Sequence, residues 1–395
     1  MSDDKVVIVA SKRTPIGQFQ GSFASLSSPT LASIAIKATL EQANIPSNDI
    51  DEVIMGCVLS AGIGQAPARQ AALFANLPNS VPCTTINKMC GSGMKAMMLG
   101  ADILLAGSQK IMLAGGMESM TNAPYILEKA RSGYRMGHGT LYDHMFLDGL
   151  EDAYYKGKLM GVFAELCAEK YRFSRKEQDD FALESLKRSK EAISNGYFKT
   201  EIAPVTLVTK AGSSVVLDDE LPSKAMPEKI PSLKPAFKDN GTVTAANSSG
   251  ISDGAAVHLL MLESEAKLRG LTPLATIVDY TTHAHEPSWF TTAPVSAIQK
   301  LLHKLNWKVS DVDLFEVNEA FAVVAMAAMK DLDIPHEKLN IHGGACALGH
   351  PIGASGARIV TTLIYALKKA GLKRGIAALC IGGGEATAMA IEIRG

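Results

Sequence analysis

The sequence lacks the cysteine pairs and histidine clusters that build disulfide frameworks and structural metal sites. Its six cysteines, at positions 57, 83, 90, 167, 346 and 380, include no C-x-x-C pair and no spacing typical of zinc ligands. Isolated thiols of this kind suit a reducing compartment. We therefore expect neither disulfides nor a structural metal ion.

The sequence also lacks a long hydrophobic run and an excess of either charge. The apolar run Ala320–Met329 has ten residues, whereas a membrane-spanning helix needs about twenty. Lys and Arg number 39 against 40 Asp and Glu, with no dense basic block, which argues against binding to DNA or RNA. The acidic start of the chain runs directly into an expected strand at Val6–Ala10, which leaves no room for a signal or transit peptide. We expect a cytoplasmic protein with no membrane or nucleic-acid partner.

The sequence does contain a pattern of helices and strands that repeats after about 262 residues. Asp49 follows a helical pattern and precedes an apolar strand, and Asp311, 262 residues later, does the same. The first copy comprises Leu31–Asn44, Val53–Val58, Met94–Ala106 and Ile111–Gly116, and the second comprises Val295–Asn306, Leu314–Val317, Arg358–Ala370 and Ala377–Gly382. The repeat predicts two similar α/β halves, each with a mostly buried sheet. Chance similarity between ordinary α/β segments is the alternative.

The stretch from 121 to about 250 interrupts this repeat. It is rich in Gly and Tyr between Ser132 and Tyr155, and a capping box of Ser174 and Glu177 opens a helix expected to reach about Ser194. Four prolines, at 222, 227, 231 and 235, predict an extended connector without regular helix. An insertion this long usually shapes a binding site.

Four short segments carry candidate chemistry. Cys90 follows an apolar stretch and precedes two glycines and a helix, so backbone N–H groups and the helix dipole should lower the pKa of its thiol. The other three segments are Asn318–Phe321, Gly349–Gly353 and Cys380–Gly384. Taken one at a time, each segment also has a purely structural interpretation. Cys90 and Cys380 could be buried core residues, and His350 could be a buried structural histidine. Asn318 could cap a helix, and Gly382–Gly384 could form only a tight turn.

Together these segments resemble the thiolase family, in its order and spacing across nearly the whole chain. The resemblance implies an α/β fold, a five-layered αβαβα sandwich of two similar halves with an inserted loop domain. It assigns 1–120, completed by about 251–270, to the N-terminal half, 121–250 to a loop domain that binds coenzyme A, and 271–395 to the C-terminal half.

The nearest branch is the biosynthetic one, the acetyl-CoA acetyltransferases, which join two acetyl-CoA molecules into acetoacetyl-CoA and coenzyme A or run the reverse thiolysis. The resemblance makes Cys90 the acyl carrier, His350 its base and Cys380 the acid and base at C2 of the second substrate. Asn318 would hold a water in one oxyanion hole, and the N–H groups of Cys90 and Gly382 would form the other.

The resemblance also implies contacts with coenzyme A thioesters, which are substrates; no prosthetic group is expected. Ser249 would meet the pantetheine, Met160 would line the acyl pocket, and Lys224 would lie near the nucleotide. Two positions depart from many biosynthetic members: Leu159 replaces a His, and Phe290 replaces a Met. A related mitochondrial enzyme binds potassium, and the matching positions here are Tyr154, Ala245, Ala246, Ser248 and Cys346.

Three other readings stay open at this point. A degradative 3-ketoacyl-CoA thiolase of broader chain length would differ only in pocket shape. An inactive thiolase-like lipid-binding protein would lack some of Cys90, Asn318, His350 and Cys380, whereas ketoacyl synthases use one Cys and two His.

Family members assemble as dimers or dimers of dimers, so we expect a homotetramer in which the apolar strand Ile111–Met120 and the loop domain make the contacts.

Overall fold

A mixed β-sheet runs through the whole molecule. The structure is a computed structural model that describes residues 4–210 and 212–394. The sheet has ten strands in the order β12-β13-β14-β11-β1-β10-β5-β3-β4, with β2 paired to β10. Its strands are β1 (Val6–Arg13), β2 (Gly17–Gln18), β3 (Glu52–Gly56), β4 (Cys83–Ile86), β5 (Ile111–Ser119), β10 (Ser252–Leu262), β11 (Ala275–Ala284), β12 (Leu314–Val317), β13 (Arg374–Ile381) and β14 (Glu385–Ile393).

The sheet is narrowest in the middle, and this divides it into two halves. β1 and β11 pair through only two residue positions, Val7 with Thr276 and Ile8 with Ala275. Within the N-terminal half β3 runs parallel to β5, and within the C-terminal half β12 runs parallel to β13. β10 pairs with both β1 and β5, so the chain returns to the N-terminal half after the long insertion.

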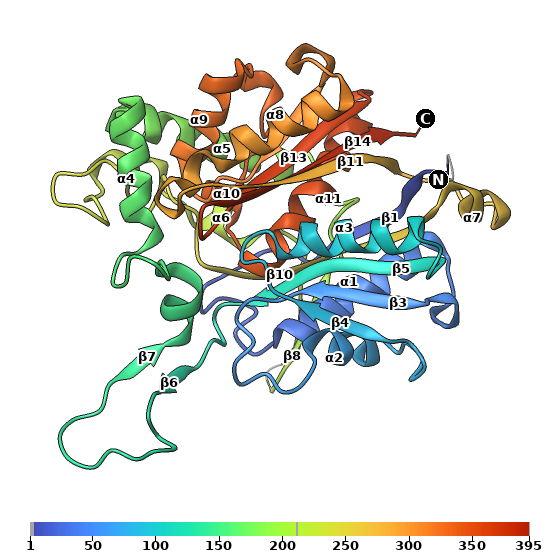
Figure 1. The fold of residues 1–395 in the computed structure, drawn as a ribbon, viewed down its shortest axis with the longest axis horizontal. Helices are drawn as coiled ribbons and strands as arrows, with labels where there is room; N and C mark the ends of the chain where they lie inside the picture. Colours follow the sequence, from blue (N-terminus) through green and yellow to red (C-terminus); the bar gives the residue numbers. More distant parts are fainter. Residues whose placement is uncertain (1–3, 211, 395) are drawn as a thin grey trace.

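Helices cover both faces of each half and form the layers (Figure 1). α1 (Ser28–Ala43) and α2 (Pro67–Phe74) cover the outer face of the N-terminal half, and α8 (Ala293–Leu305) and α9 (Ala322–Leu332) cover that of the C-terminal half. α3 (Ser92–Leu105) and α11 (Ile352–Ala370) lie between the halves. The predicted five-layered αβαβα sandwich is confirmed. Because both faces of the sheet are covered, all nine residues of β5 are buried.

The two central helices pack closely at their N-terminal ends. A Cβ at Gly93 would lie 2.8 Å from the backbone N of Ala357, and one at Gly356 would lie 2.5 Å from the backbone N of Met94. Only glycine permits this approach. The packing brings the turns before α3 and α11, which carry Cys90 and His350, to the same place. α11 begins at Ile352, six residues before the predicted Arg358, because Pro351 is suited to a helix N-terminus.

The insertion has structure of its own. A thin ribbon of β6 (Tyr125–Leu127) and β7 (Leu141–Asp143) projects away from the body (Figure 1), followed by the short π-helix η2 (Phe146–Leu150) and α4 (Met160–Tyr171). The predicted capping box of Ser174 and Glu177 is confirmed at the start of α5 (Arg175–Ser194). A hairpin of β8 (Val205–Thr209) and β9 (Gly212–Val216) follows. Among the described residues, no helix combines the length and the hydrophobicity of a membrane span.

The predicted extended connector is wrong in part. The proline-rich stretch contains α6 (Glu220–Lys224) and the 3₁₀ helix η3 (Pro227–Ser232). Pro222 lies in the first turn of α6 and Pro227 at the start of η3, where the N–H that proline lacks has no helical partner in any case. The short remaining elements are η1 (Ser47–Asp49), α7 (Glu263–Leu268), η4 (Pro287–Thr292), η5 (Val309–Asp311), η6 (His336–Lys338) and α10 (Ala345–Leu348).

Candidate active site

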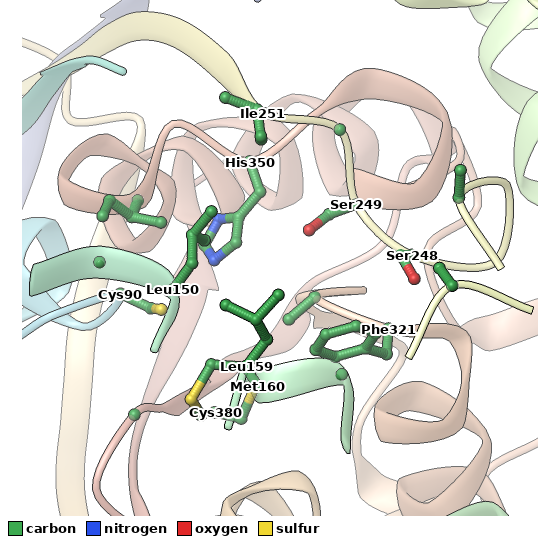
Figure 2. Close-up of a pocket in the computed structure, with 18 of the residues that line it drawn as sticks. Cys90, Leu150, Leu159, Met160, Ser248, Ser249, Ile251, Phe321, His350 and Cys380 are labelled. Atoms are coloured by element: carbon green, nitrogen blue, oxygen red, sulfur yellow. The ribbon is translucent and has the colours of Figure 1, made fainter. Parts of the chain in front are cut away.

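The largest concentration of candidate residues lies around one apolar cavity of about 520 Å³. The turns before α3 and α11 and the end of β13 supply one wall, and segments of the insertion together with Phe290 and Phe321 of the C-terminal half supply the other. Figure 2 shows Cys90, His350 and Cys380 on one side and Ser248, Ser249 and Phe321 on the other. The apolar part of the lining includes Phe146, Leu150, Leu159, Met160, Phe237, Phe290, Phe321 and Ile352.

Cys90 lies on a tightly bonded turn between β4 and α3. The preceding residue, Met89, has a φ of 46°, in the left-handed region. The N–H of Gly91 donates to the carbonyl of Lys88 at 3.0 Å, and Oγ of Ser92 donates to the carbonyl of Met89 at 2.7 Å. These bonds hold the cysteine at the entrance to the helix, with its sulfur at the cavity (Figure 2).

The predicted lowering of the Cys90 pKa is wrong. Burial raises the pKa of this thiol to about 11, although the backbone N–H groups of Gly382 and of Cys90 itself act in the opposite direction. Loss of hydration disfavours the thiolate more than the two N–H donors favour it. The sulfur therefore needs a base before it can act as a nucleophile.

His350 offers such a base. Its Nδ1 lies 2.5 Å from Oγ of Ser355, and this hydroxyl donates to the carbonyl of Pro351 at 2.9 Å. The hydroxyl therefore accepts from Nδ1–H, which leaves Nε2 as the unprotonated nitrogen. Nε2 is buried without a partner among the described residues, and the ring lines the cavity. Burial, followed by the charge of Arg358, lowers the pKa of His350 to about 3, so the imidazole is neutral at physiological pH.

Asn318 lies behind His350. Its Nδ2 is 3.5 Å from Nδ1 of His350, and its Oδ1 accepts from Arg358 at 3.3 Å. The side chain is buried and is absent from the cavity lining. The alternative role as a helix cap is wrong, because α9 begins at Ala322 with Phe321 as its N-cap.

Cys380 lies next to the end of β13, Gly382 begins the turn between β13 and β14, and both line the same cavity as Cys90. Burial, followed by the nearby Cys90, raises the pKa of the Cys380 thiol well above its usual range. Two thiols from different halves of the sandwich thus face one cavity, together with an unprotonated imidazole nitrogen. This set can transfer an acyl group between thiols and move a proton to or from carbon.

The residues expected to meet coenzyme A fall into two places. Ser249, Met160, Leu159 and Phe290 line the cavity itself. Lys224 lines an adjoining hollow of about 420 Å³ that shares Gln18, Leu221, Ala245 and Gly250 with the cavity. The Lys224 side chain is half exposed, and its Nζ lies 3.6 Å from Glu220.

The five positions matched to a potassium site are spread along this side of the molecule. Ala245 and Ser248 line the cavity, and Ala245, Ala246 and Cys346 line the adjoining hollow. Tyr154 is exposed and lies beside Gly383. Within residues 4–210 and 212–394, no group of three His, Cys, Asp or Glu side chains could hold a metal ion.

Sequence reasoning missed several residues that shape the site. Ser355 and Arg358 lie on α11 within the same motif as His350, and their spacing of five and eight residues was the available signal. Leu150, Phe146 and Phe237 line the cavity from the insertion, and nothing in their local sequence marks them.

Two cysteines and a histidine that meet between two similar α/β halves define a class of thiol-dependent acyl-transfer enzyme. The chain belongs to the thiolase family: residues 6–264 match the thiolase N-terminal domain and residues 271–393 match the thiolase C-terminal domain.

Relatives match the chain from end to end. It is 50% identical to a probable acetyl-CoA acetyltransferase of Dictyostelium discoideum, over 98% of this chain and 94% of that protein. It is 48% identical to the acetyl-CoA acetyltransferase of Escherichia coli strain K12, over 98% of each. Solved structures agree in fold: the Bacillus anthracis acetyl-CoA acetyltransferase has a TM-score of 0.96 at 41% identity, covering 99% of both chains. A thiolase of Ascaris suum in complex with coenzyme A has a TM-score of 0.93 at 40% identity, covering 99% of this chain and 100% of that one.

Proposed function

We propose that this protein is an acetyl-CoA C-acetyltransferase. It condenses two acetyl-CoA molecules into acetoacetyl-CoA and coenzyme A, and it catalyses the reverse thiolysis. One observation carries the proposal: Cys90, Cys380 and the unprotonated Nε2 of His350 face one cavity. The relatives named acetyl-CoA acetyltransferase support the choice of substrate.

The first half-reaction acetylates Cys90. His350 takes the thiol proton through Nε2, and the resulting thiolate attacks the thioester carbonyl of acetyl-CoA. The carbon–sulfur bond to coenzyme A breaks, and Cys380 gives its proton to the leaving thiolate. The products are acetyl-Cys90, free coenzyme A, a protonated His350 and a Cys380 thiolate.

The second half-reaction forms the carbon–carbon bond. The Cys380 thiolate takes a proton from C2 of a second acetyl-CoA, and the carbanion attacks the acetyl carbonyl on Cys90. The raised pKa of Cys380 suits this step, because a thiolate of high pKa is a strong base. The bond to Cys90 then breaks, and His350 returns its proton to the Cys90 sulfur, which restores the starting enzyme.

Two groups of donors would stabilise the oxygens that become negative. The N–H groups of Cys90 and Gly382 face the Cys90 sulfur and would bind the oxygen of the acetyl group on it. His350 and a water held by Asn318 would bind the enolate oxygen of the second substrate. Preorganised donors of this kind contribute about 3 kcal/mol each.

Coenzyme A would enter along the insertion. Ser249 would meet the pantetheine, Met160, Leu159 and Phe290 would border the acyl group, and Lys224 in the adjoining hollow would attract the nucleotide phosphates.

The predominantly apolar wall also favours a second candidate, a degradative 3-ketoacyl-CoA thiolase of broader chain length. All four residues whose loss would mark an inactive lipid-binding relative are present: Cys90, Asn318, His350 and Cys380.

Three further points belong to the proposal. The six free cysteines support a reducing, cytoplasmic location. A homotetramer is supported by exposed apolar residues on the projecting ribbon, such as Tyr125, Leu141 and Met136, which is 99% exposed. Light scattering across a dilution series would test the homotetramer, and an active species near 41.9 kDa would exclude it.

A potassium ion near Ala245 and Ser248 would bind through backbone carbonyls. Comparison of the enzyme activity in potassium and in sodium buffers tests this idea.

Intact-mass measurement after incubation with acetyl-CoA tests the central claim. The wild type should gain one acetyl group, and Cys90→Ala should gain none. A mutant acetylated at the wild-type level would refute the role of Cys90. Thiolysis of 3-ketoacyl-CoA substrates of increasing length separates the two enzyme candidates, because a short-chain enzyme should lose activity beyond acetoacetyl-CoA.

A further inference from the structure

An ion pair joins the turn that carries Cys90 to the turn that follows Cys380. Nζ of Lys88, two residues before Cys90, contacts Oε2 of Glu385, the first residue of β14 after the glycine turn. The two residues are 297 positions apart and come from opposite halves of the sandwich. The side chains are 23% and 36% exposed, so water does not fully screen the pair.

The two turns also touch beneath this pair. A Cβ at Gly91 would overlap Cδ1 of Ile381, so the backbone of the Cys90 turn lies directly on the Cys380 strand. Beside it, Cε of Met89 lies 3.9 Å from the Cβ position of Gly382. Apolar contacts of this kind keep the two turns from moving closer together, but they do little to stop one turn from sliding along the other, because such contacts are not directional. The ion pair between Lys88 and Glu385 opposes this sliding, because it joins one specific atom on each turn.

The relative position of the turns matters for chemistry. Gly382, on one turn, and Cys90, on the other, line the same cavity, and the N–H of Gly382 is close enough to the Cys90 sulfur to oppose the rise in its pKa. A small displacement between the turns would lengthen this contact and weaken the donor set around the sulfur. Misplacement of a reacting group by about 1 Å can cost about a hundredfold in rate.

We propose that Lys88 and Glu385 are positioning residues, whose ion pair holds the Gly382 N–H against the Cys90 sulfur. The inference rests on the proposed function only for its effect on catalysis. Its effect on the sulfur itself is independent of any substrate. Without the pair, the Cys90 thiolate has a weaker donor and forms less readily.

The test is the rate at which iodoacetamide alkylates Cys90 at pH 8, with the labelled cysteine identified by peptide mapping. Lys88→Met and Glu385→Gln should each lower this rate roughly three- to tenfold. The exchanged double variant Lys88→Glu, Glu385→Lys should recover most of the wild-type rate, because the pair re-forms with its charges reversed. In the wild type, 1 M salt should slow alkylation, and in Glu385→Gln it should not.

The chain offers a matched control at the other end of the same hairpin. Arg374 of β13 and Glu392 of β14 form an ion pair of 2.8 Å, with side chains 37% and 23% exposed. Glu392→Gln should leave the alkylation rate of Cys90 unchanged, and the melting temperatures of the two Glu→Gln variants should be similar. Wild-type rates in Lys88→Met and Glu385→Gln would overturn the inference. So would an equal loss in Glu392→Gln, or a failure of the exchanged variant to recover.

The two proposals fail in different ways. If the wild type formed no acetyl-enzyme with acetyl-CoA, the proposed function would be wrong, but the alkylation rates would still decide the role of Lys88 and Glu385. If acetyl-enzyme formed normally in the wild type and in both single variants, and alkylation was also unchanged, only the positioning role would be lost.

Discussion

Nδ1 of His350 lies 2.5 Å from Oγ of Ser355, and this contact decides which ring nitrogen faces the cavity. Because the Ser355 hydroxyl gives its own proton to Pro351, it can only accept from the ring. The proton therefore stays on Nδ1, and Nε2 is free to take one from Cys90.

Ser355→Ala should therefore slow catalysis without preventing folding. The imidazole would lose the partner that fixes its tautomer, and we expect kcat to fall roughly tenfold to a hundredfold with little change in KM. Steady-state kinetics with acetoacetyl-CoA and coenzyme A, beside the melting temperature, measures this. A variant that loses stability but keeps its turnover per folded molecule would show that Ser355 serves packing alone.

Cys380→Ser should separate the two half-reactions. The acetyl carrier is intact, so Cys90 should still be acetylated, but exchange of the C2 hydrogens of acetyl-CoA with deuterium from solvent should collapse. Mass spectrometry of the protein and NMR of the substrate follow the two events separately. Exchange near the wild-type rate would rule out Cys380 as the acid and base.

Asn318→Ala should lower kcat roughly 100- to 1000-fold, with a much smaller effect on KM, if Asn318 holds the oxyanion water. The structure adds a second expectation. Asn318 accepts from Arg358 and its Nδ2 lies 3.5 Å from Nδ1 of His350, so the variant should also disturb the packing of the imidazole. Asn318→Asp keeps the volume but removes the amide donor, and should be about as inactive. Recovery of activity in Asn318→Asp would argue against the amide as the active group.

The buried His258 should make the protein less stable in acid. Its Nε2 lies 3.1 Å from the carbonyl of Ala357, and burial lowers its pKa from 6.5 to about 4. Between pH 6.5 and pH 4, His258 binds a proton in the unfolded chain but not in the folded chain. The contribution of neutral His258 to stability is therefore complete above pH 6.5 and is lost as the pH falls toward 4.

His258→Gln removes this dependence. Whatever its stability at pH 7, the variant should lose about 2 kcal/mol less than the wild type between pH 7 and pH 5. Urea unfolding at one fixed protein concentration gives the two free energies. Parallel curves for the two proteins over this range would mean that His258 is not buried in its neutral form.

The amino-acid sequence by itself determined the repeat, the four motifs and the helix that Ser174 caps. These features are local or periodic: an apolar pattern, a capping residue or a run of glycines acts on its immediate neighbours, so it can be read without knowing the fold. The order of the motifs was enough to indicate the family and therefore the layers.

Only the tertiary structure decided the properties that depend on residues distant in sequence but close in space. The pKa of Cys90 is raised because burial removes water from the sulfur, and no local pattern states how much water a turn will lose. The tautomer of His350 depends on the hydroxyl of Ser355, five residues further along the chain. The pairing of Lys88 with Glu385 exists only because the Cys90 turn packs on Ile381 at the end of β13, and that approach is a property of the folded chain.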